Sequence, residues 1–373
     1  MIKYLGSKRV LVPRLVSLVG ALPTVRTAVD LFSGTARVAH AWKRAGLRVT
    51  ANDHNTYAQT LARCYVQADG RRVRAEAERL LPELSAVAPR AGWFTQTYCV
   101  ESRYFHPDNG ARIEAIRERI AGLSLEPELE AVLLVSLMEA ADRVDSTVGV
   151  QMAYLKQWAK RAHNALALRL PEVLDGDGAA LGLDAAEAAR AVGRVDLAYL
   201  DPPYNQHSYR GNYHVWETLV RWDAPETYGI ARKRVDCRTH KSAFNRRKDG
   251  EVAFRQLIDA IDARFLLVSF NDEGYLAPAA IHAILGPRGV VHEVAVPFHR
   301  YVGAKIGIYS PQGEKVGAVS HTENHEHLFL VDTEHRLTRI DSSGVRRSLA
   351  PSRCDLNVTP SSSIVRRSAR EKT

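Results

Sequence analysis

The chain has 373 residues, of which 46% are hydrophobic and 25% charged, and its formal net charge is +9. This content excludes a disordered chain and a minimal disulfide-stapled domain, and it allows one large domain with an insertion or two modest domains. The basic balance favours a polyanionic partner, although a basic surface without a partner would have the same charge. Four scattered cysteines, no signal peptide and no run of about 18 apolar residues predict a cytoplasmic, nucleoid-associated protein without membrane contact.

The chain opens with Lys3-Tyr4-Leu5-Gly6-Ser7-Lys8, a basic loop that leads into a helical pattern. Leucines recur at helical spacing from Leu11 to Leu22, and Ser7 is placed to cap that helix. A basic loop at a helix N-terminus offers N–H groups and ammonium groups to a carboxylate or a phosphate. A solvated first turn explains these residues equally well.

The next segment predicts a strand at residues 25–32, a turn at Ser33-Gly34-Thr35-Ala36 and a helix up to Ala45. Small residues in such a turn let a nucleotide approach the backbone, and the helix N-terminus faces the nucleotide. Ala36 occupies a position where glycine is common, and we expect alanine to be tolerated there with a negative φ.

A second strand at residues 47–51 ends in Asn52-Asp53. Asp53 follows the glycine turn by about 20 residues, which is the interval expected for an acidic ribose ligand. Its alternative role is to cap the helix that begins near Thr56, and one carboxylate has enough acceptor sites for both roles.

Helical patterns occupy residues 65–168, where a simple α/β fold would place a strand, and they are clearest at 127–144 and 152–168. We therefore predict a helical insertion between the second and third strands. Its basic residues suit a polyanionic partner, although a helical cap with solvated arginines would have the same composition. They are Arg71, Arg72, Arg74, Arg103, Arg112, Arg117, Arg143, Lys156, Lys160 and Arg161. A short strand at 172–174 and the turn Asp175-Gly176-Asp177-Gly178 follow.

An apolar run at residues 195–200 ends on Asp201-Pro202-Pro203-Tyr204. Such a run predicts a buried parallel strand, and ligands bind beyond the carboxyl ends of these strands. The prolines stiffen the turn, so that the Asp201 carboxylate, the Pro202 carbonyl and the Tyr204 ring face one point. Two acceptors and an aromatic ring suit an amino group on a flat heterocycle. An ordinary turn with a capping aspartate is the simpler alternative.

The polar and aromatic segment 205–213 is too long for a simple connection, and we interpret it as a lid over the target base. Basic clusters further along fit phosphate contacts, with a solvated surface loop as the competing interpretation. The candidate DNA-binding residues are His207, Tyr209, Arg232, Lys233, Arg234 and Lys305.

A buried strand is predicted at 265–270, and a hairpin at 290–296 and 327–331. The histidines at 321, 325 and 327 and Glu323 lack the spacing of a metal site, so no metal is predicted. Residues 336–373 are rich in Ser and Arg and have few large apolar side chains, which predicts a flexible basic tail.

Five motifs in a fixed order give the chain its resemblance to a known family. They are the Lys3–Lys8 opening, Asp30-x-Phe32-x-Gly34-x-Ala36, Asn52-Asp53, Asp201-Pro202-Pro203-Tyr204 and the turn at 269–274. With these motifs the chain resembles the Dam-like α-group of S-adenosylmethionine-dependent DNA adenine-N6 methyltransferases. The resemblance implies an α/β fold with a doubly wound, seven-stranded, mostly parallel sheet. It also implies a catalytic domain at 1–65 and 169–335 and a DNA-binding helical insertion at 66–168.

The implied reaction transfers a methyl group from S-adenosyl-L-methionine to the N6 amine of a flipped adenine in double-stranded DNA. The implied catalytic residues are Asp201, Pro202, Pro203 and Tyr204. The implied cofactor-binding residues are Tyr4, Lys8, Asp30, Phe32, Gly34, Thr35, Asp53 and, as acceptor for the cofactor's adenine amine, Asp177. A cognate restriction endonuclease is a candidate partner. Two alternatives stay open: a cytosine-N4 or RNA amino-methyltransferase, and a non-catalytic nucleic-acid-binding protein.

Overall fold

A computed structural model describes residues 1–203, 208–239, 242–272, 274–299, 308–309, 315–317 and 323–334 of the chain. Four of the predicted features therefore lie outside the described residues. They are Tyr204, His207, Lys305 and the basic tail at 336–373.

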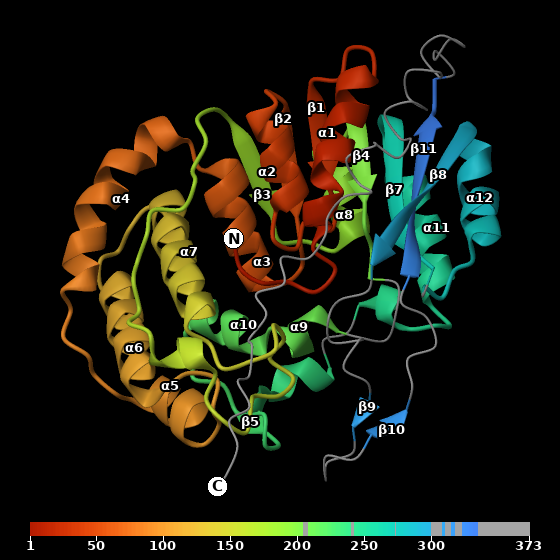
Figure 1. The fold of residues 1–373 in the computed structure, drawn as a ribbon. Helices are drawn as coiled ribbons and strands as arrows, with labels where there is room; N and C mark the ends of the chain where they lie inside the picture. The colour runs from red at the N-terminus through yellow and green to blue at the C-terminus, as the bar shows by residue number, and fades with distance from the viewer. Residues whose placement is uncertain are drawn as a thin grey trace, which may run out of the picture.

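Seven strands of the described chain form one sheet in the order β3-β2-β1-β4-β7-β11-β8 (Figure 1). Neighbouring strands from β3 to β7 run parallel, whereas β11 pairs antiparallel with both β7 and β8. The strands are β1 (Thr27–Asp30), β2 (Arg48–Asn52), β3 (Gly178–Leu181), β4 (Val195–Leu200), β7 (Ala263–Asn271), β8 (Val290–His299) and β11 (Glu323–Asp332). This arrangement confirms the predicted seven-stranded, mostly parallel sheet.

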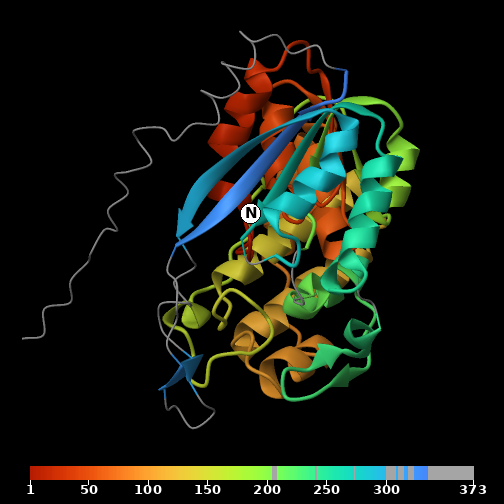
Figure 2. The ribbon, with the colours of Figure 1, turned by 90° about the vertical axis from the view of Figure 1, so that its right-hand side faces the viewer.

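Helices cover both faces of the sheet because alternate residues of its central strands point in opposite directions. Leu197 and Tyr199 of β4 belong to one apolar core, and Ala198 and Leu200 belong to the other. The first core includes side chains of α1 (Val12–Ala21), α2 (Arg37–Arg44) and α3 (Thr56–Ala62). The second includes side chains of α8 (Ala185–Val192), α11 (Gly250–Ala260) and α12 (Pro278–Leu285), which lie on the opposite side of the sheet in Figure 2.

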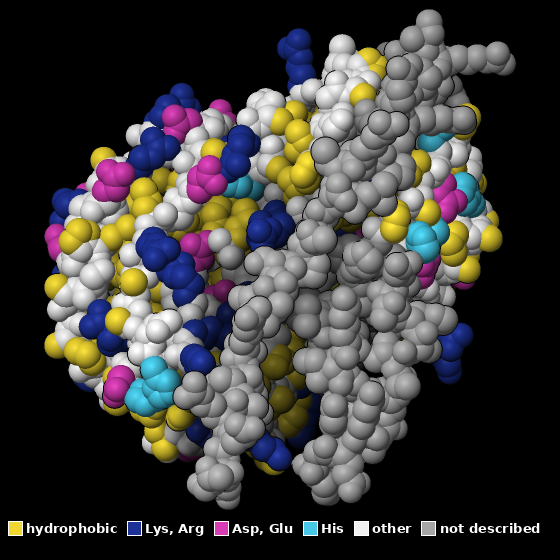
Figure 3. Space-filling view, in the orientation of Figure 1, with side chains coloured by type: hydrophobic (Ala, Val, Ile, Leu, Met, Phe, Trp, Pro, Cys, Tyr) yellow, Lys and Arg dark blue, Asp and Glu magenta, His cyan; other side chains and the backbone are white. Residues whose placement is uncertain are grey.

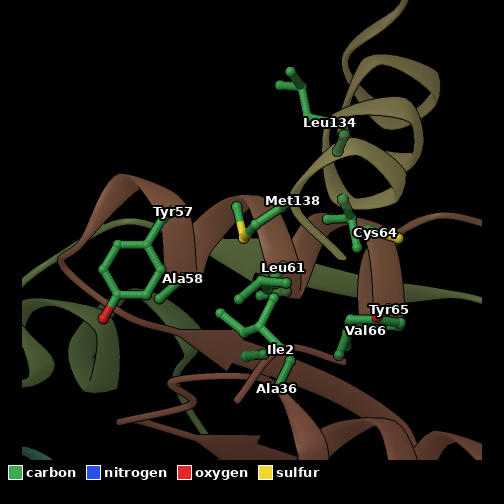
Figure 4. Close-up of a cluster of buried hydrophobic side chains, with 14 of the residues drawn as sticks. Ile2, Ala36, Tyr57, Ala58, Leu61, Cys64, Tyr65, Val66, Leu134 and Met138 are labelled. Carbon is green, nitrogen blue, oxygen red and sulfur yellow. The ribbon is translucent and has the colours of Figure 1, made fainter. Parts of the chain in front are cut away.

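A helical insertion separates β2 from β3, as predicted. It contains α4 (Gly70–Ser85), α5 (Trp93–Thr95), α6 (Pro107–Ala121), α7 (Pro127–Arg143) and two π-helical turns at Arg63–Gln67 and Gln96–Val100. The insertion shares the first core with the sheet, because Leu134 and Met138 of α7 belong to the same cluster as Leu61 of α3 (Figure 4).

The predicted helix at 152–168 is wrong, since the structure has only a 3-10 turn there, at Lys160–His163. Side chains of the neighbouring helices form hydrogen bonds with backbone carbonyls of this segment instead. Asn109 of α6 donates to the carbonyls of Ala162 and Asn164, and Ser136 of α7 donates to the carbonyl of Arg169. These tertiary hydrogen bonds override a local helical pattern.

Short elements complete the described chain. They are α9 (Tyr209–Asn212), α10 (His214–Arg221), β5 (Thr227–Tyr228), β6 (Lys233–Arg234), β9 (Ile308–Tyr309), β10 (Lys315–Gly317) and 3-10 turns at Lys8–Val10, Val235–Arg238, Ala243–Asn245 and Gly286–Arg288. Ser7 makes no side-chain cap, and the first α-helix begins at Val12 rather than directly after Ser7. None of the helices in the described part of the chain has the length and apolar composition of a membrane span.

Candidate active site

A pocket of about 760 Å³, counting space open to solvent, lies beyond the carboxyl ends of β1 to β4. Parallel strands end at the same edge of a sheet, so residues far apart in sequence meet there. Phe32 follows β1, Asp53 follows β2, Asp184 follows β3 and Asp201 follows β4, and all four line the pocket. Tyr4, Lys8, Asp30, Gly34 and Thr35, which were predicted as cofactor ligands, also line it.

Two residues of the glycine turn, Gly34 and Ala36, have left-handed backbone. Gly34 has φ +50°, and a Cβ built there would lie 3.1 Å from the Tyr4 ring. Ala36 has φ +58°, so our expectation of a negative φ was wrong. Ala36 caps the N-terminus of α2 and donates its N–H to the Ser33 carbonyl at 2.6 Å, and this tight reversal sets its conformation. Alanine pays about 1–2 kcal/mol for that conformation.

Tyr4 lies in a group of tyrosines beside this turn. Its ring stacks on Tyr213 and Tyr209, with centroids 4.6 and 5.2 Å apart, and its hydroxyl lies 3.1 Å from the Tyr57 hydroxyl. Tyr209, which we predicted as a DNA contact, thus lines the pocket and packs against the N-terminal loop. Tyr213 was predicted only as part of the segment 205–213, and Tyr57, on α3, was not predicted as a site residue, because its place in the group depends on how α3 and the segment before α10 meet at this edge.

Asp53 joins the two loops that flank the pocket. Its Oδ2 accepts the Gly34 N–H at 3.1 Å, and its Oδ1 accepts the Asn55 N–H at 2.9 Å. The residue before α3 is Asn55, which makes no side-chain cap, and Asp53 binds Asn55 rather than the first turn, so the predicted capping role of Asp53 near Thr56 was wrong. The carboxylate stays at the pocket wall, where a hydroxyl could compete for it.

Asp177 does not reach the pocket, and its prediction as a cofactor ligand is not supported. It is exposed and precedes β3, so it lies at the amino ends of the strands, opposite the pocket. The error arose from placing the strand at 172–174, whereas β3 is Gly178–Leu181. Asp184 follows β3 and lines the pocket, and its side chain accepts the Ala186 N–H at 3.0 Å.

Asp201 forms an ion pair that the sequence did not indicate. Lys8 Nζ lies 2.9 Å from Asp201 Oδ1 and 2.5 Å from Glu326 Oε1. Burial raises the pKa of Asp201 to about 6, with Lys8 opposing this shift and Glu326 adding to it. At neutral pH the carboxylate is therefore still mainly ionised. Lys8, predicted as a cofactor ligand, instead has its ammonium between two carboxylates.

Asp30 lies beneath the same pocket and is 1% exposed. Burial, followed by the negative charge of Asp201, raises the pKa of Asp30 to about 8. Its backbone partner is the Phe32 N–H, 3.4 Å from Oδ1. Asp30 is consequently protonated at neutral pH.

Several buried polar atoms at the pocket wall have no hydrogen-bond partner among the described residues. They are Ser33 Oγ, Asn55 Oδ1 and Tyr199 OH. Buried polar groups are normally hydrogen-bonded, so unsatisfied ones at a pocket point to a bound polar molecule. A carboxylate beside the glycine turn, unpartnered hydroxyls and a left-handed turn fit a nucleoside-containing cofactor such as S-adenosylmethionine.

The basic run at 232–234 does not form a free cationic surface, which corrects the DNA-binding prediction. Arg234 is 2% exposed and binds Asp223 through both terminal nitrogens, at 2.6 and 2.7 Å. Arg232 lies 3.0 Å from Glu101. Burial and pairing therefore exclude Arg234 from contact with phosphates, whereas Arg232 is partly exposed and bound to one carboxylate.

Arginines of the insertion are likewise committed to protein contacts. Arg117 is buried and donates to the carbonyls of Leu219 and Val220. Arg161 pairs with Asp145 at 2.8 Å. On the face shown in Figure 3, the Lys and Arg side chains over the helical side are interspersed with Asp and Glu. This distribution favours the solvated helical cap over a continuous DNA-binding stripe on that face.

The histidines near the C-terminal strands pair with carboxylates. His327 lies between Asp272 and Glu293, with nitrogen–oxygen distances of 2.5 and 2.7 Å. Opposite charges on both sides raise its pKa against the effect of burial. Within the described residues no group of three or more His, Cys, Asp or Glu side chains is placed to hold a metal ion.

Comparison with known proteins matches residues 4–276 to the family described as D12 class N6 adenine-specific DNA methyltransferase. The Type II methyltransferase M.NlaIII of Neisseria lactamica is 29% identical over 286 residues, which cover 74% of this chain and 84% of that protein. The Type II methyltransferase M.FokI of Planomicrobium okeanokoites is 30% identical over 331 residues, covering 83% of this chain but 49% of that protein. Modification methylase StsI of Streptococcus sanguinis is 27% identical, with coverages of 80% and 48%. The chain thus spans about half the length of the last two relatives.

Proposed function

This chain belongs to the D12 class N6 adenine-specific DNA methyltransferases, and from that premise we propose how its pocket methylates the N6 amine of adenine at specific DNA sites. Family membership removes the non-catalytic alternative and favours adenine in DNA over cytosine or RNA. The observation that supports the proposal is the meeting of Asp201, Asp53 and the Gly34 turn in one pocket.

S-adenosylmethionine, when bound, supplies an electrophilic methyl group on its sulfonium centre. We assign the ribose hydroxyls to Asp53, the close backbone approach to Gly34, and the cofactor's adenine amine to Asp184 in place of Asp177. The hydroxyl of Ser33 offers one further hydrogen bond. Because Lys8 is engaged by two carboxylates, the methionine carboxylate is more readily bound by backbone N–H groups of the N-terminal loop.

The target adenine must leave the DNA stack to reach the pocket, at a cost of a few kcal/mol. Its N6 lone pair is delocalised into the ring, so the amine is a weak nucleophile. The ionised Asp201 carboxylate and the Pro202 carbonyl would accept the two N6 hydrogens and hold the lone pair in line with the methyl group. As the N–C bond forms, the bond between the methyl group and sulfur would break with its electron pair left on sulfur. N6 would then be cationic, and its proton would pass to the Asp201 carboxylate. Tyr204 is proposed to stack on the base.

The DNA-binding path is proposed to include Lys233 and the exposed lysines of the insertion, Lys156 and Lys160. The names of M.NlaIII and M.FokI describe Type II enzymes, and we extend to this chain the proposal of a cognate restriction endonuclease.

Asp201→Asn tests the catalytic assignment, because the amide keeps the shape of the side chain but donates where the carboxylate accepts. We expect loss of N6-methyladenine formation, measured by nucleoside mass spectrometry, with cofactor affinity within a few fold of the parent. Asp259→Asn is the matched control, since Asp259 is an exposed carboxylate on α11 outside the pocket. Retained turnover in Asp201→Asn would contradict the proposed chemistry.

A further inference from the structure

Glu326 is a buried carboxylate on the antiparallel strand β11, outside the residues 4–276 that match the family. It shares a strand face with Leu328 and Leu330, which belong to the first apolar core. A carboxylate on such a face destabilises the fold unless it is paired and hydrogen-bonded. Because Glu326 is only 4% exposed, its carboxylate needs specific partners.

Two partners meet the same oxygen of Glu326. Ser269 on β7 donates its hydroxyl to Oε1, and Lys8 Nζ lies 2.5 Å from that atom. The same ammonium lies 2.9 Å from Oδ1 of Asp201. Lys8 thus bridges the carboxylate of the catalytic motif and a carboxylate on a strand that follows it by more than a hundred residues.

We propose that Glu326 is a positioning residue for methyl transfer, which holds Lys8 in place so that Lys8 in turn fixes the Asp201 carboxylate toward the target amine. The inference rests on the proposed role of Asp201. A lysine ammonium on its flexible four-carbon stem would not stay in one place with a single partner. Asp201 and Glu326, the latter fixed by Ser269, together hold the Lys8 ammonium in place. They prevent it from moving to the cofactor's carboxylate or to a DNA phosphate.

The charges around Asp201 determine in which direction its pKa should change when Glu326 is replaced. The charged or titratable groups that act on this site are Lys8, Glu326, Asp30 and Tyr199. Of these, Lys8 lowers the pKa of Asp201 and Glu326 raises it. Glu326→Gln keeps an acceptor for Ser269 and Lys8 but removes one negative charge. It should therefore lower the pKa of Asp201.

The experiment measures single-turnover methylation of DNA across pH, per folded molecule, with cofactor affinity measured separately by calorimetry. In the parent the rate should fall as the pH falls through the pKa of Asp201, near 6. We call this fall in rate at acidic pH the acid limb. In Glu326→Gln the acid limb should move to lower pH. Glu326→Ala, which removes the partner altogether, should slow methyl transfer about 10- to 100-fold through misplacement of Asp201. In both variants the cofactor should bind as in the parent.

Glu293→Gln is the matched control, because Glu293 is another paired carboxylate of the hairpin, bound to His282 and His327 and outside the pocket. It should leave the acid limb in place. An unmoved limb in Glu326→Gln together with an unchanged rate in Glu326→Ala would overturn the inference, as would a lower melting temperature without any change in rate per folded molecule. If Asp201→Asn stays active, the proposed function fails instead. If Asp201→Asn is inactive and the Glu326 variants behave as the parent, only this inference fails.

Discussion

Asp53 Oδ2 accepts the backbone N–H of Gly34 at 3.1 Å, so the carboxylate assigned to the ribose also holds the glycine turn in place. Asp53→Ala should weaken cofactor binding by about 1.5–3 kcal/mol, the value of charge-assisted hydrogen bonds, while Asp201 keeps its surroundings. Calorimetric titration with S-adenosylmethionine measures this loss. Asp53→Asn, which retains an acceptor for Gly34, should lose less affinity, and an unchanged dissociation constant in Asp53→Ala would place the ribose elsewhere.

Gly34→Ala should weaken cofactor binding because its new methyl group would lie 3.1 Å from the Tyr4 ring. The left-handed φ adds about 1–2 kcal/mol of strain. Gly46→Ala is the matched control, since Gly46 also has a positive φ, of +91°, but no heavy atom within 4 Å of an added Cβ. Both variants should lose stability in urea unfolding, whereas only Gly34→Ala should lose cofactor affinity. Equal affinities would show that Tyr4 can move without consequence.

Asp184→Ala should reduce cofactor affinity, and Asp177→Ala should not, because only Asp184 lines the pocket. Asp184 also caps α8, so its loss should lower stability by about 0.5–2 kcal/mol. Asp184→Ser retains a capping oxygen and separates the two effects. Binding is measured on each variant at a temperature where all are folded. The assignment would be refuted if Asp177→Ala were the weaker binder.

Arg234→Ala should destabilise the fold by about 1.5–3 kcal/mol, because it removes charged hydrogen bonds to Asp223 and Asp236, which keep Arg221 as a partner. Lys233→Ala should be nearly neutral for stability and should reduce the salt dependence of DNA binding by up to about 0.9 per lost phosphate contact. Urea unfolding and DNA titrations at several salt concentrations measure the two effects. A stable Arg234→Ala with a lower salt slope would restore Arg234 as a DNA contact.

Asp30→Asn should stabilise the protein at alkaline pH. The pKa of Asp30 is near 8 in the folded chain, against 3.8 as its ordinary value, so the folded state holds an extra proton between these limits. The stabilisation that this proton brings is complete below the ordinary pKa and is lost as the pH rises toward 8. The difference in unfolding free energy between Asp30→Asn and the parent should therefore grow from about pH 4 to about pH 8 and stay constant above that. A constant difference would mean that Asp30 ionises normally.

Local patterns in the sequence were sufficient to predict the strands and turns that form the pocket edge of the sheet. The apolar run before Asp201, the small residues around Gly34 and the interval to Asp53 each depend on residues within one βα unit. The order of these units along the chain predicted the parallel sheet. Where the local signal was ambiguous, as at residues 172–181, the strand was misplaced, so Asp177 was predicted as a ligand and Asp184 was not considered.

Only the tertiary structure decided which charges face one another. In the sequence, Arg234 and Arg117 cannot be told from solvated arginines. In the structure they are buried, because α10 and the insertion cover them. Lys8 meets Glu326 across 318 residues only because β11 inserts antiparallel between β7 and β8. Periodicity and turn signals report a residue's near neighbours, whereas the pairing of distant charges depends on strand order and on which faces become buried. Burial, followed by these long-range contacts, shifts the pKa of Asp201, and no local pattern encodes either of them.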